Sequence, residues 1–443
     1  MVKLMLKESS KMKAEKIIKM SLIMVFLGVF TGCTQLEDSN TPDLGNISFD
    51  NSGSSEAQEA FLTGVKGLHN FQFDVARLAF EDAADIDPTF AMAHWGQAMS
   101  NNFPLWARQD LSEGMEVLNQ LAPTFEGRLA LSGTEKEKAY MTAVEALFFS
   151  SEDKLERDFA YSNAMEKMHT KWPDDHEISI FYALSLLGTV RPGDEGYKRQ
   201  ALAASIVMPI LEKNKTHPGA AHFTIHSLDD PDHAILALPA AKVYADIAPS
   251  SAHALHMPSH IFLQLGMWER VVNSNIESYA SAVSRTKQLK ANNVKNLANS
   301  AVGREDFHAL QWLHYANLML GHYDRAEENL NMALKVVEMN PGNNFAHYGY
   351  LNILARHAIE TADCSRVRLS SPDNSEGKHD ALIAAAGMCA AIDRNMETAS
   401  AAKERLKGHR IQAEDSGRAY NALQIQILEK EVEAMMKLAA GEY

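Results

Sequence analysis

The stretch FDVARLAFEDAADIDPTFAMAHWG, residues 73–96, decides the fold class. Its apolar residues recur every three or four positions, which is the period of an amphipathic helix. Ala76 and Ala83 are small, as is needed where two helices cross closely, and Pro88 ends the helix because it has no backbone N–H to donate. Gly64, twelve residues before Ala76, supplies a small position on the preceding helix. The stretch therefore predicts a helix-turn-helix pair.

The same pattern returns along the chain. Gly321 and Ala326 repeat it in LMLGHYDRAEENLNMAL (318–334), Gly266 in LQLGMWERVV (263–272) and Ala237 in ALPAAKVYADIAP (237–249). The A-x3-F-x2-A-x4-P spacing and the period of about 34 residues resemble the tetratricopeptide repeat (TPR) family, and the chain resembles bacterial TPR lipoproteins. The resemblance implies an all-α, right-handed solenoid of helix-turn-helix repeats over 57–360, followed by C-terminal helical repeats and a cap over 361–443.

Charge and motifs exclude several classes of function. The chain has 443 residues, 57 acidic and 42 basic, for a formal net charge of −15. Because such a field repels phosphate backbones, nucleic acid is not an expected partner. The sequence has no G-x-S-x-G, Walker, G-x-G-x-x-G or C-x-x-C motif, so the familiar hydrolase, nucleotide-binding and redox signatures are missing. Whether the protein is an enzyme stays open.

The N-terminus has the features of a targeting segment. Lysines precede the apolar run MSLIMVFLGVF, which is too short to span a bilayer and suits a signal peptide. The run ends in FTGC (30–33), which resembles a bacterial lipobox, so we expect residues 1–32 to be a lipoprotein signal peptide and Cys33 to be lipidated. The polar residues 33–56 predict a flexible tether. The expected location is the cell envelope, lipid-anchored to a membrane (the outer membrane if the organism has one).

Cys364 and Cys389 are the two remaining cysteines. In an oxidising compartment they are able to pair and close a loop, which stabilises a fold by restricting the unfolded chain. The alternative is a pair of buried thiols, and the spacing alone does not decide between the two.

Histidines concentrate in one part of the chain: seven of the 18 lie between His217 and His260. His222 and His256 are 34 residues apart, and so are His226 and His260, so both pairs occupy positions 5 and 9 of successive first helices. The TPR resemblance implies that these positions face the concave surface. Because residues four apart share a helix face, we expect two neighbouring helices to present the four imidazoles to one space.

This arrangement predicts a metal site, because an i,i+4 histidine pair is a spacing by which a helix chelates a divalent transition metal. Zn²⁺ is the expected ion, since imidazole and carboxylate suit it. Asp229 and Asp230 are candidates for a catalytic base. Two alternatives stay open, hydrogen-bonding histidines in a partner groove and structural packing. The predicted ligands are His222, His226, Asp229, His256 and His260, with His217, His233 and His253 as a second tier.

Positions 5 and 9 of other repeats predict a largely apolar groove, the usual lining of a ligand site. The alternative is a closed superhelix in which these residues are core. The groove residues are Trp95, Met99, Ile180, Leu184, Gln311 and Tyr315. Three functions follow: a lipid-anchored protein that binds a protein segment, peptide or small ligand in its groove; a metal-dependent hydrolase or metal-binding protein; and a structural scaffold of an envelope complex.

Overall fold

The computed structural model describes residues 42–291 and 305–442, and this part of the chain is helical apart from one short hairpin. The helices of the N-terminal half are α2 (Gln58–His69), α3 (Phe73–Ile86), α4 (Ala91–Met99), α5 (Leu111–Leu121), α6 (Phe125–Leu131), α7 (Glu135–Phe149), α8 (Lys154–Lys171), α9 (His176–Gly188) and α10 (Lys198–Lys213). Those that follow are α11 (Pro218–Ser227), α12 (Ala234–Ala241), α13 (Tyr244–Ile247), α14 (Ala252–His256), α15 (Pro258–Gln264), α16 (Trp268–Ala291), α17 (Glu305–Met319), α18 (Tyr323–Met339), α19 (Asn344–Thr361), α20 (Asp380–Ile392), α21 (Met396–Asp415) and α22 (Ala419–Ala440).

Short elements join some of these helices. The hairpin pairs β1 (Asn102–Phe103) antiparallel with β2 (Arg108–Gln109), with Asn102 opposite Gln109. Single turns of 3₁₀ helix form at η1 (Ser55–Ala57), η2 (Pro104–Trp106) and η3 (Glu376–Lys378).

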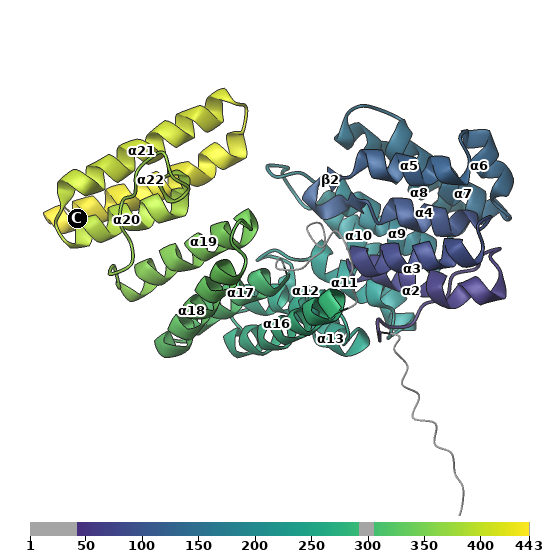
Figure 1. The fold of residues 1–443 in the computed structure, drawn as a ribbon, viewed down its shortest axis with the longest axis horizontal. Coiled ribbons are helices and arrows are strands. Elements are labelled where there is room, and N and C mark those ends of the chain that lie inside the picture. Colours follow the sequence, from purple (N-terminus) through teal and green to yellow (C-terminus); the bar gives the residue numbers. More distant parts are fainter. Residues whose placement is uncertain (1–41, 292–304, 443) are drawn as a thin grey trace, which may run out of the picture. The chain divides into compact units, whose positions relative to one another are not determined.

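Small residues let the helices of a repeat approach closely, as the sequence predicts. A Cβ added to Gly64 on α2 would lie 2.7 Å from the Phe80 ring on α3, and one on Gly67 would lie 2.9 Å from the backbone of Ala76. Helices that follow each other in sequence pack on each other, among them α7 on α8, α16 on α17 and α20 on α21 (Figure 1). The fold is an all-α helical repeat solenoid.

The segment before the first helix is packed against the repeats, so the prediction of a flexible tether is wrong for residues 43–56. The Phe49 ring lies 5.2 Å from the Phe61 ring and 5.9 Å from the Trp95 ring, and Leu44 is fully buried. The Ser52 hydroxyl donates to the Glu137 carboxylate (2.8 Å). Apolar side chains hidden in a polar segment drive this packing. The predicted signal peptide and Cys33 lie outside the described residues.

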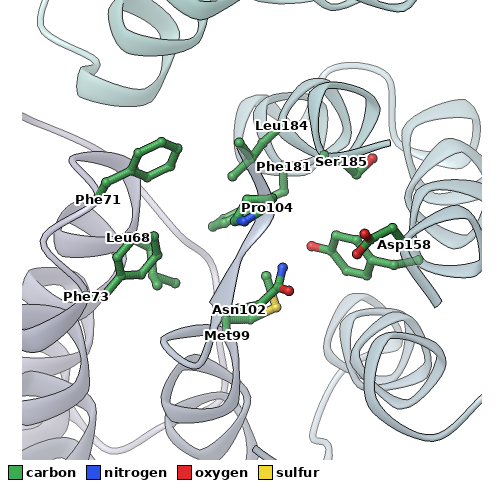
Figure 2. A pocket seen from close by; sticks show the side chains of 12 residues that line it. Leu68, Phe71, Phe73, Met99, Asn102, Pro104, Asp158, Phe181, Leu184 and Ser185 are labelled. Carbon is green, nitrogen blue, oxygen red and sulfur yellow. The ribbon is translucent and has the colours of Figure 1, made fainter. Parts of the chain in front are cut away.

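The predicted groove is wrong for four of its six residues, because Trp95, Met99, Ile180 and Leu184 are buried in the core. The Trp95 ring on α4 lies 5.3 Å from the Phe181 ring on α9. Met99 and Leu184 line only a small cavity of about 20 Å³, roughly one water in size (Figure 2). In this part of the chain the repeats are closed on their inner side.

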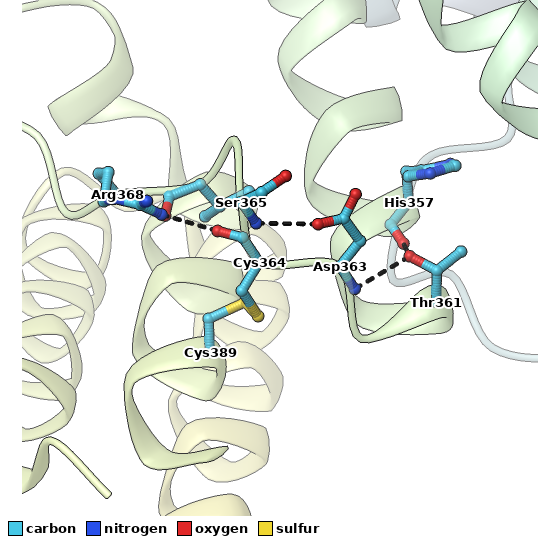
Figure 3. Close-up of a disulfide and its surroundings, with 8 residues drawn as sticks. His357, Thr361, Asp363, Cys364, Ser365, Arg368 and Cys389 are labelled. Carbon is cyan, nitrogen blue, oxygen red and sulfur yellow. Dashed lines mark hydrogen bonds between the residues drawn. A yellow bond between two sulfur atoms is a disulfide. The ribbon is translucent and has the colours of Figure 1, made fainter. Parts of the chain in front are cut away.

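A disulfide joins Cys364, just after α19, to Cys389 on α20 (Figure 3). It ties the polar connection after Thr361 to the C-terminal helices α20, α21 and α22, which lie side by side (Figure 1). Between residues 42–291 and 305–442, we find no helix with both the length and the apolar character to cross a membrane.

Candidate metal centre

The histidine-rich region builds three neighbouring first helices. Pro218 opens α11, where its missing N–H costs nothing, and His217 caps the same end by accepting from the Ala220 amide. The next first helix is split at Pro258 into α14 and α15, because proline cannot donate to the preceding turn. The third first helix is α17. Together they carry the side chains described below.

Six histidines from these helices form two clusters of three. The first histidine trio is His222, His226 and His253, and the second histidine trio is His256, His260 and His308. Within each trio one ring nitrogen per residue lies within 4.8 Å of the others. His222 and His256 are buried at the base of their trios, whereas the other four residues are partly exposed. The structure thus brings the four predicted histidines together, but divides them between two sites.

His308 was missed by sequence reasoning, which treats it as structural, although a signal for it exists. His253 lies three residues before His256, and His308 lies three residues before Gln311, so both occupy position 2 of their repeats. Each trio therefore combines positions 5 and 9 of one first helix with position 2 of the next. His253, a second-tier candidate, is a full member of its trio.

Two of the three histidines in the second trio have their Nδ1 atoms hydrogen-bonded to an acceptor. His256 Nδ1 lies 2.7 Å from Asn275 Oδ1, and the amide of Asn275 is oriented by its own donation to the Val271 carbonyl (2.8 Å). His260 Nδ1 donates to Asp229 Oδ2 at 2.7 Å. Burial would raise the pKa of Asp229, but the hydrogen bond from His260 outweighs it and holds that pKa below its usual value. Asp229 is thus an ionised acceptor that orients a ligand.

These hydrogen bonds bring the two Nε2 atoms close together. A neutral imidazole carries one proton, and an acceptor at Nδ1 holds that proton on Nδ1 of a neutral His256 or His260. Their Nε2 atoms lie 3.1 Å apart, with no proton between them in the neutral state. Two unprotonated nitrogens at this distance repel unless a cation lies between them. A metal-ligating histidine typically donates its second nitrogen to a carboxylate or carbonyl in this way.

The first trio follows the same plan. His222 Nδ1 donates to the backbone carbonyl of His69 (2.6 Å), which leaves its Nε2 lone pair 3.0 Å from His253 Nε2. His226 Nε2 is buried and has no hydrogen-bond partner among the residues described. A buried polar atom without a partner costs about 1–3 kcal/mol, so a ligand that satisfied His226 would recover that loss.

Burial keeps these imidazoles neutral. It lowers the pKa of His222, His226, His253 and His256 well below 6.5, and the neighbouring histidines lower each pKa further by mutual repulsion. Neutral imidazole is the form that binds a metal ion. Protonation of these four histidines is therefore disfavoured at neutral pH, whereas their neutral rings are able to bind a metal ion.

Aromatic rings enclose both trios. The Phe71 ring lies 4.5 Å from His222, and the Trp312 ring lies 4.4 Å from His260. Phe71 has a φ of +52°, a left-handed conformation that favours glycine. At the same repeat position stand Gly266 (φ +67°) and Gly321 (φ +71°). The first repeat thus carries a strained aromatic residue where later repeats have glycine, and its ring packs on the first trio.

A third cluster of titratable groups is structural. His69 Nε2 and His217 Nε2 donate to the two oxygens of Glu177, at 2.7 and 2.9 Å. Burial alone would raise the pKa of Glu177, but the facing imidazoles lower it to about 2. Because His217 Nδ1 accepts a backbone N–H, its proton is on Nε2, and that nitrogen has no lone pair for a metal. These three residues also lie close enough to hold a metal ion, but the hydrogen bond that His217 Nδ1 accepts favours the structural role, and His217 as a metal ligand stays a prediction.

Two other predicted residues lie apart from the trios. His233 Nδ1 binds Asp230 at 2.8 Å, and Asp230 also accepts the backbone amides of Asp232 and His233. This local turn holds the start of α12, so Asp230 is neither a base for the trios nor a ligand to them. Asp229, predicted as a ligand, contacts His260 on the side away from its Nε2 and serves as an orienting acceptor.

Each trio has the donor set of an open metal site. Three imidazole nitrogens at about 2.0–2.1 Å would bind Zn²⁺ and leave a fourth position for water or substrate. Imidazole also suits copper, nickel and iron, and thiolate and carboxylate ligands are missing from both trios.

Comparisons with known proteins add little to this geometry. No family model matches the sequence, and no curated protein matches it. Among solved structures, the chain matches a crystal structure of the P58(IPK) TPR domain, with 14% identity over 87% of this chain and 99% of that chain and a TM-score of 0.22.

Proposed function

We propose that this protein binds two transition metal ions, one in each histidine trio. The observation that carries the proposal is the approach of His256 Nε2 to His260 Nε2, 3.1 Å apart, while the Nδ1 atom of each ring is hydrogen-bonded to Asn275 or Asp229. Burial lowers the pKa of His256, which favours its neutral, metal-binding form, and the Trp312 ring lies 4.4 Å from the His260 ring. Zn²⁺ is the expected ion, and a water on it would be acidified towards neutral pH, as hydrolysis requires.

Calorimetric titration of chelator-treated mature protein with Zn²⁺ tests the proposal. Two ions per chain are expected, and His253→Ala and His308→Ala should each lose tight binding of one ion. His233→Ala is the matched control, because His233 lies in the same stretch but pairs with Asp230 outside the trios. Absence of stoichiometric uptake, or equal loss in the control, would refute metal binding at the trios.

A second function, binding of a protein segment or small ligand, is favoured by a cleft of about 820 Å³ between α17, α19, α20 and α22. The predicted groove residues Gln311 and Tyr315 line it, as does Trp312, whose other side packs on His260. A photo-crosslinker at Tyr315 is expected to capture the ligand in cells. The same group at the exposed Tyr323 on α18 is the control, and equal labelling from both positions would count against the cleft.

We also propose that the protein acts outside the cytoplasm, held to a membrane by lipid at Cys33. The FTGC sequence supports the anchor, and the Cys364–Cys389 disulfide supports the location, because such bonds persist in oxidising compartments. Replacing Cys33 with Ser should release the protein from the membrane fraction. Unchanged fractionation would rule out the lipid anchor.

A further inference from the structure

The two histidine trios face one shared space. The His226 and His260 rings, which belong to different trios, have centroids 6.4 Å apart. Within the first trio the His226 and His253 rings are 6.3 Å apart, so the gap between trios is close to the widest gap inside the first trio. The partly exposed residues of each trio lie on the accessible side, and the buried bases His222 and His256 lie behind them.

The spacing of the trios determines what can join the two ions. His226 and His260 hold the same position in successive repeats, so their separation reports the step from one ion to the next. Two ions spaced by the same 6.4 Å step as these rings would lie farther apart than the roughly 3.5–4 Å at which two ions share a single bridging oxygen. A three-atom bridge, O–P–O or O–C–O, spans a longer distance and leaves one oxygen for each ion.

Charge favours the same kind of ligand. Two divalent ions would bring four positive charges, while Asp229, the carboxylate that contacts His260, supplies one negative charge, which leaves three positive charges (4 − 1). Phe71 and Trp312 wall the site with apolar surface, where an uncompensated charge is costly. An anion placed between the ions lowers that cost, a carboxylate by one charge and a phosphate dianion by two, and contacts both ions.

We propose that the two metal ions together bind one oxyanion group of the substrate, a phosphate or a carboxylate, with one oxygen on each ion. The proposal rests on the metal binding proposed above. In this arrangement the metal pair selects the anionic group, and the neighbouring cleft beside Trp312 receives the rest of the molecule.

The test is calorimetry of the protein loaded with two Zn²⁺ ions and freed of excess metal, with inorganic phosphate as the probe. One phosphate per chain is expected, and its affinity should fall at least tenfold in His253→Ala and in His308→Ala, each of which keeps one ion. His233→Ala should bind phosphate as the parent does. Circular dichroism of each variant verifies that the helices are intact.

The outcomes separate the two proposals. If no Zn²⁺ binds, the proposed function itself fails. If two ions bind but phosphate affinity is the same with one ion as with two, metal binding stands and the bridged oxyanion is refuted. Acetate serves as a second probe. Preference for phosphate assigns a phosphoryl group and preference for acetate a carboxylate, while failure of both anions to bind overturns the proposal.

Discussion

His253 and His308 occupy the same position of successive repeats, and each completes the trio begun by the repeat before it. The second trio therefore uses the same repeat positions as the first, one repeat further along the solenoid. Each trio spans the junction between two repeats, so neither repeat alone holds a complete site. This dependence on stacking couples any bound ion to the packing of the array.

Asn275 is expected to control the second trio without touching the ion. Replacing it with Leu keeps the volume but removes the acceptor that holds the proton of His256 on Nδ1. We expect Zn²⁺ affinity at the second trio to fall by about 10–100-fold, as is usual for loss of such an outer partner. The first trio, which uses the His69 carbonyl instead, should be unaffected. Calorimetry resolves the two sites, and unchanged affinity at the second would show that Asn275 has no orienting role.

The substitution Phe71→Gly has two opposing effects on stability, because it relieves backbone strain and removes aromatic packing. Glycine relieves the positive φ, which is worth about 1 kcal/mol, but removing a buried phenyl ring costs about 3–5 kcal/mol. The net effect on the free energy of unfolding should be a loss of about 2–4 kcal/mol in urea denaturation. Gly266→Ala is the control at the same repeat position and should lose only about 1 kcal/mol, from φ alone. If the Phe71→Gly variant is as stable as the parent, packing of the Phe71 ring does not stabilise the fold.

Acid should destabilise the metal-free protein in a defined window. The pKa values of His222, His226, His253 and His256 are lowered by burial, so below pH 6.5 the unfolded chain binds protons that the folded chain does not. The free energy of unfolding should fall by up to about 1.4 kcal/mol per pH unit for each such histidine as the pH drops from 6.5 towards 5. Glu177, with a pKa of about 2, adds its own loss only below pH 4.5.

Bound Zn²⁺ should move the acid transition to lower pH, because protons must first displace the metal. Thermal melts between pH 7.5 and 5, with and without Zn²⁺, make the comparison. A metal-free protein whose stability is constant over this range would mean that the histidines are not buried as neutral groups.

Phe49→Ala tests whether residues 43–56 belong to the folded unit. The ring packs on Phe61, Trp95 and Tyr140, so its removal should cost about 3–5 kcal/mol of unfolding free energy. Asp50→Ala is the control, because the Asp50 side chain is 92% exposed and should matter little. Equal stability of the two variants would support a flexible tether.

The sequence predicts the helix pairs and five of the six trio histidines, with His253 only in the second tier, because repeat period and helical spacing both fix where a side chain points. The third member of the second trio, His308, was not predicted. Its last member follows His256 by 52 residues (308 − 256), whereas His253 follows His222 by only 31 (253 − 222), since α16 and the residues after it lengthen that repeat. The equivalence of His253 and His308 is hidden by this insertion.

Four of the predicted groove residues on the inner face are buried, which the repeat pattern did not predict. Trp95 and Ile180 hold the same repeat position as His222 and His256, but the rings of Phe49, Tyr140 and Phe181 contact Trp95. Such contacts join residues far apart in sequence, and the repeat pattern does not report them. The pairing of Asp230 with His233 was missed for the opposite reason, because a local turn satisfies both groups.

Anomalous diffraction from crystals of the mature protein grown with Zn²⁺ at neutral pH tests the central claim most directly. We predict two peaks at the zinc edge, one within bonding distance of the Nε2 atoms of His256 and His260, and one beside His222 Nε2. Well-ordered crystals with no anomalous peak at either trio, and with the facing nitrogens of His256 and His260 moved apart or protonated, would contradict it.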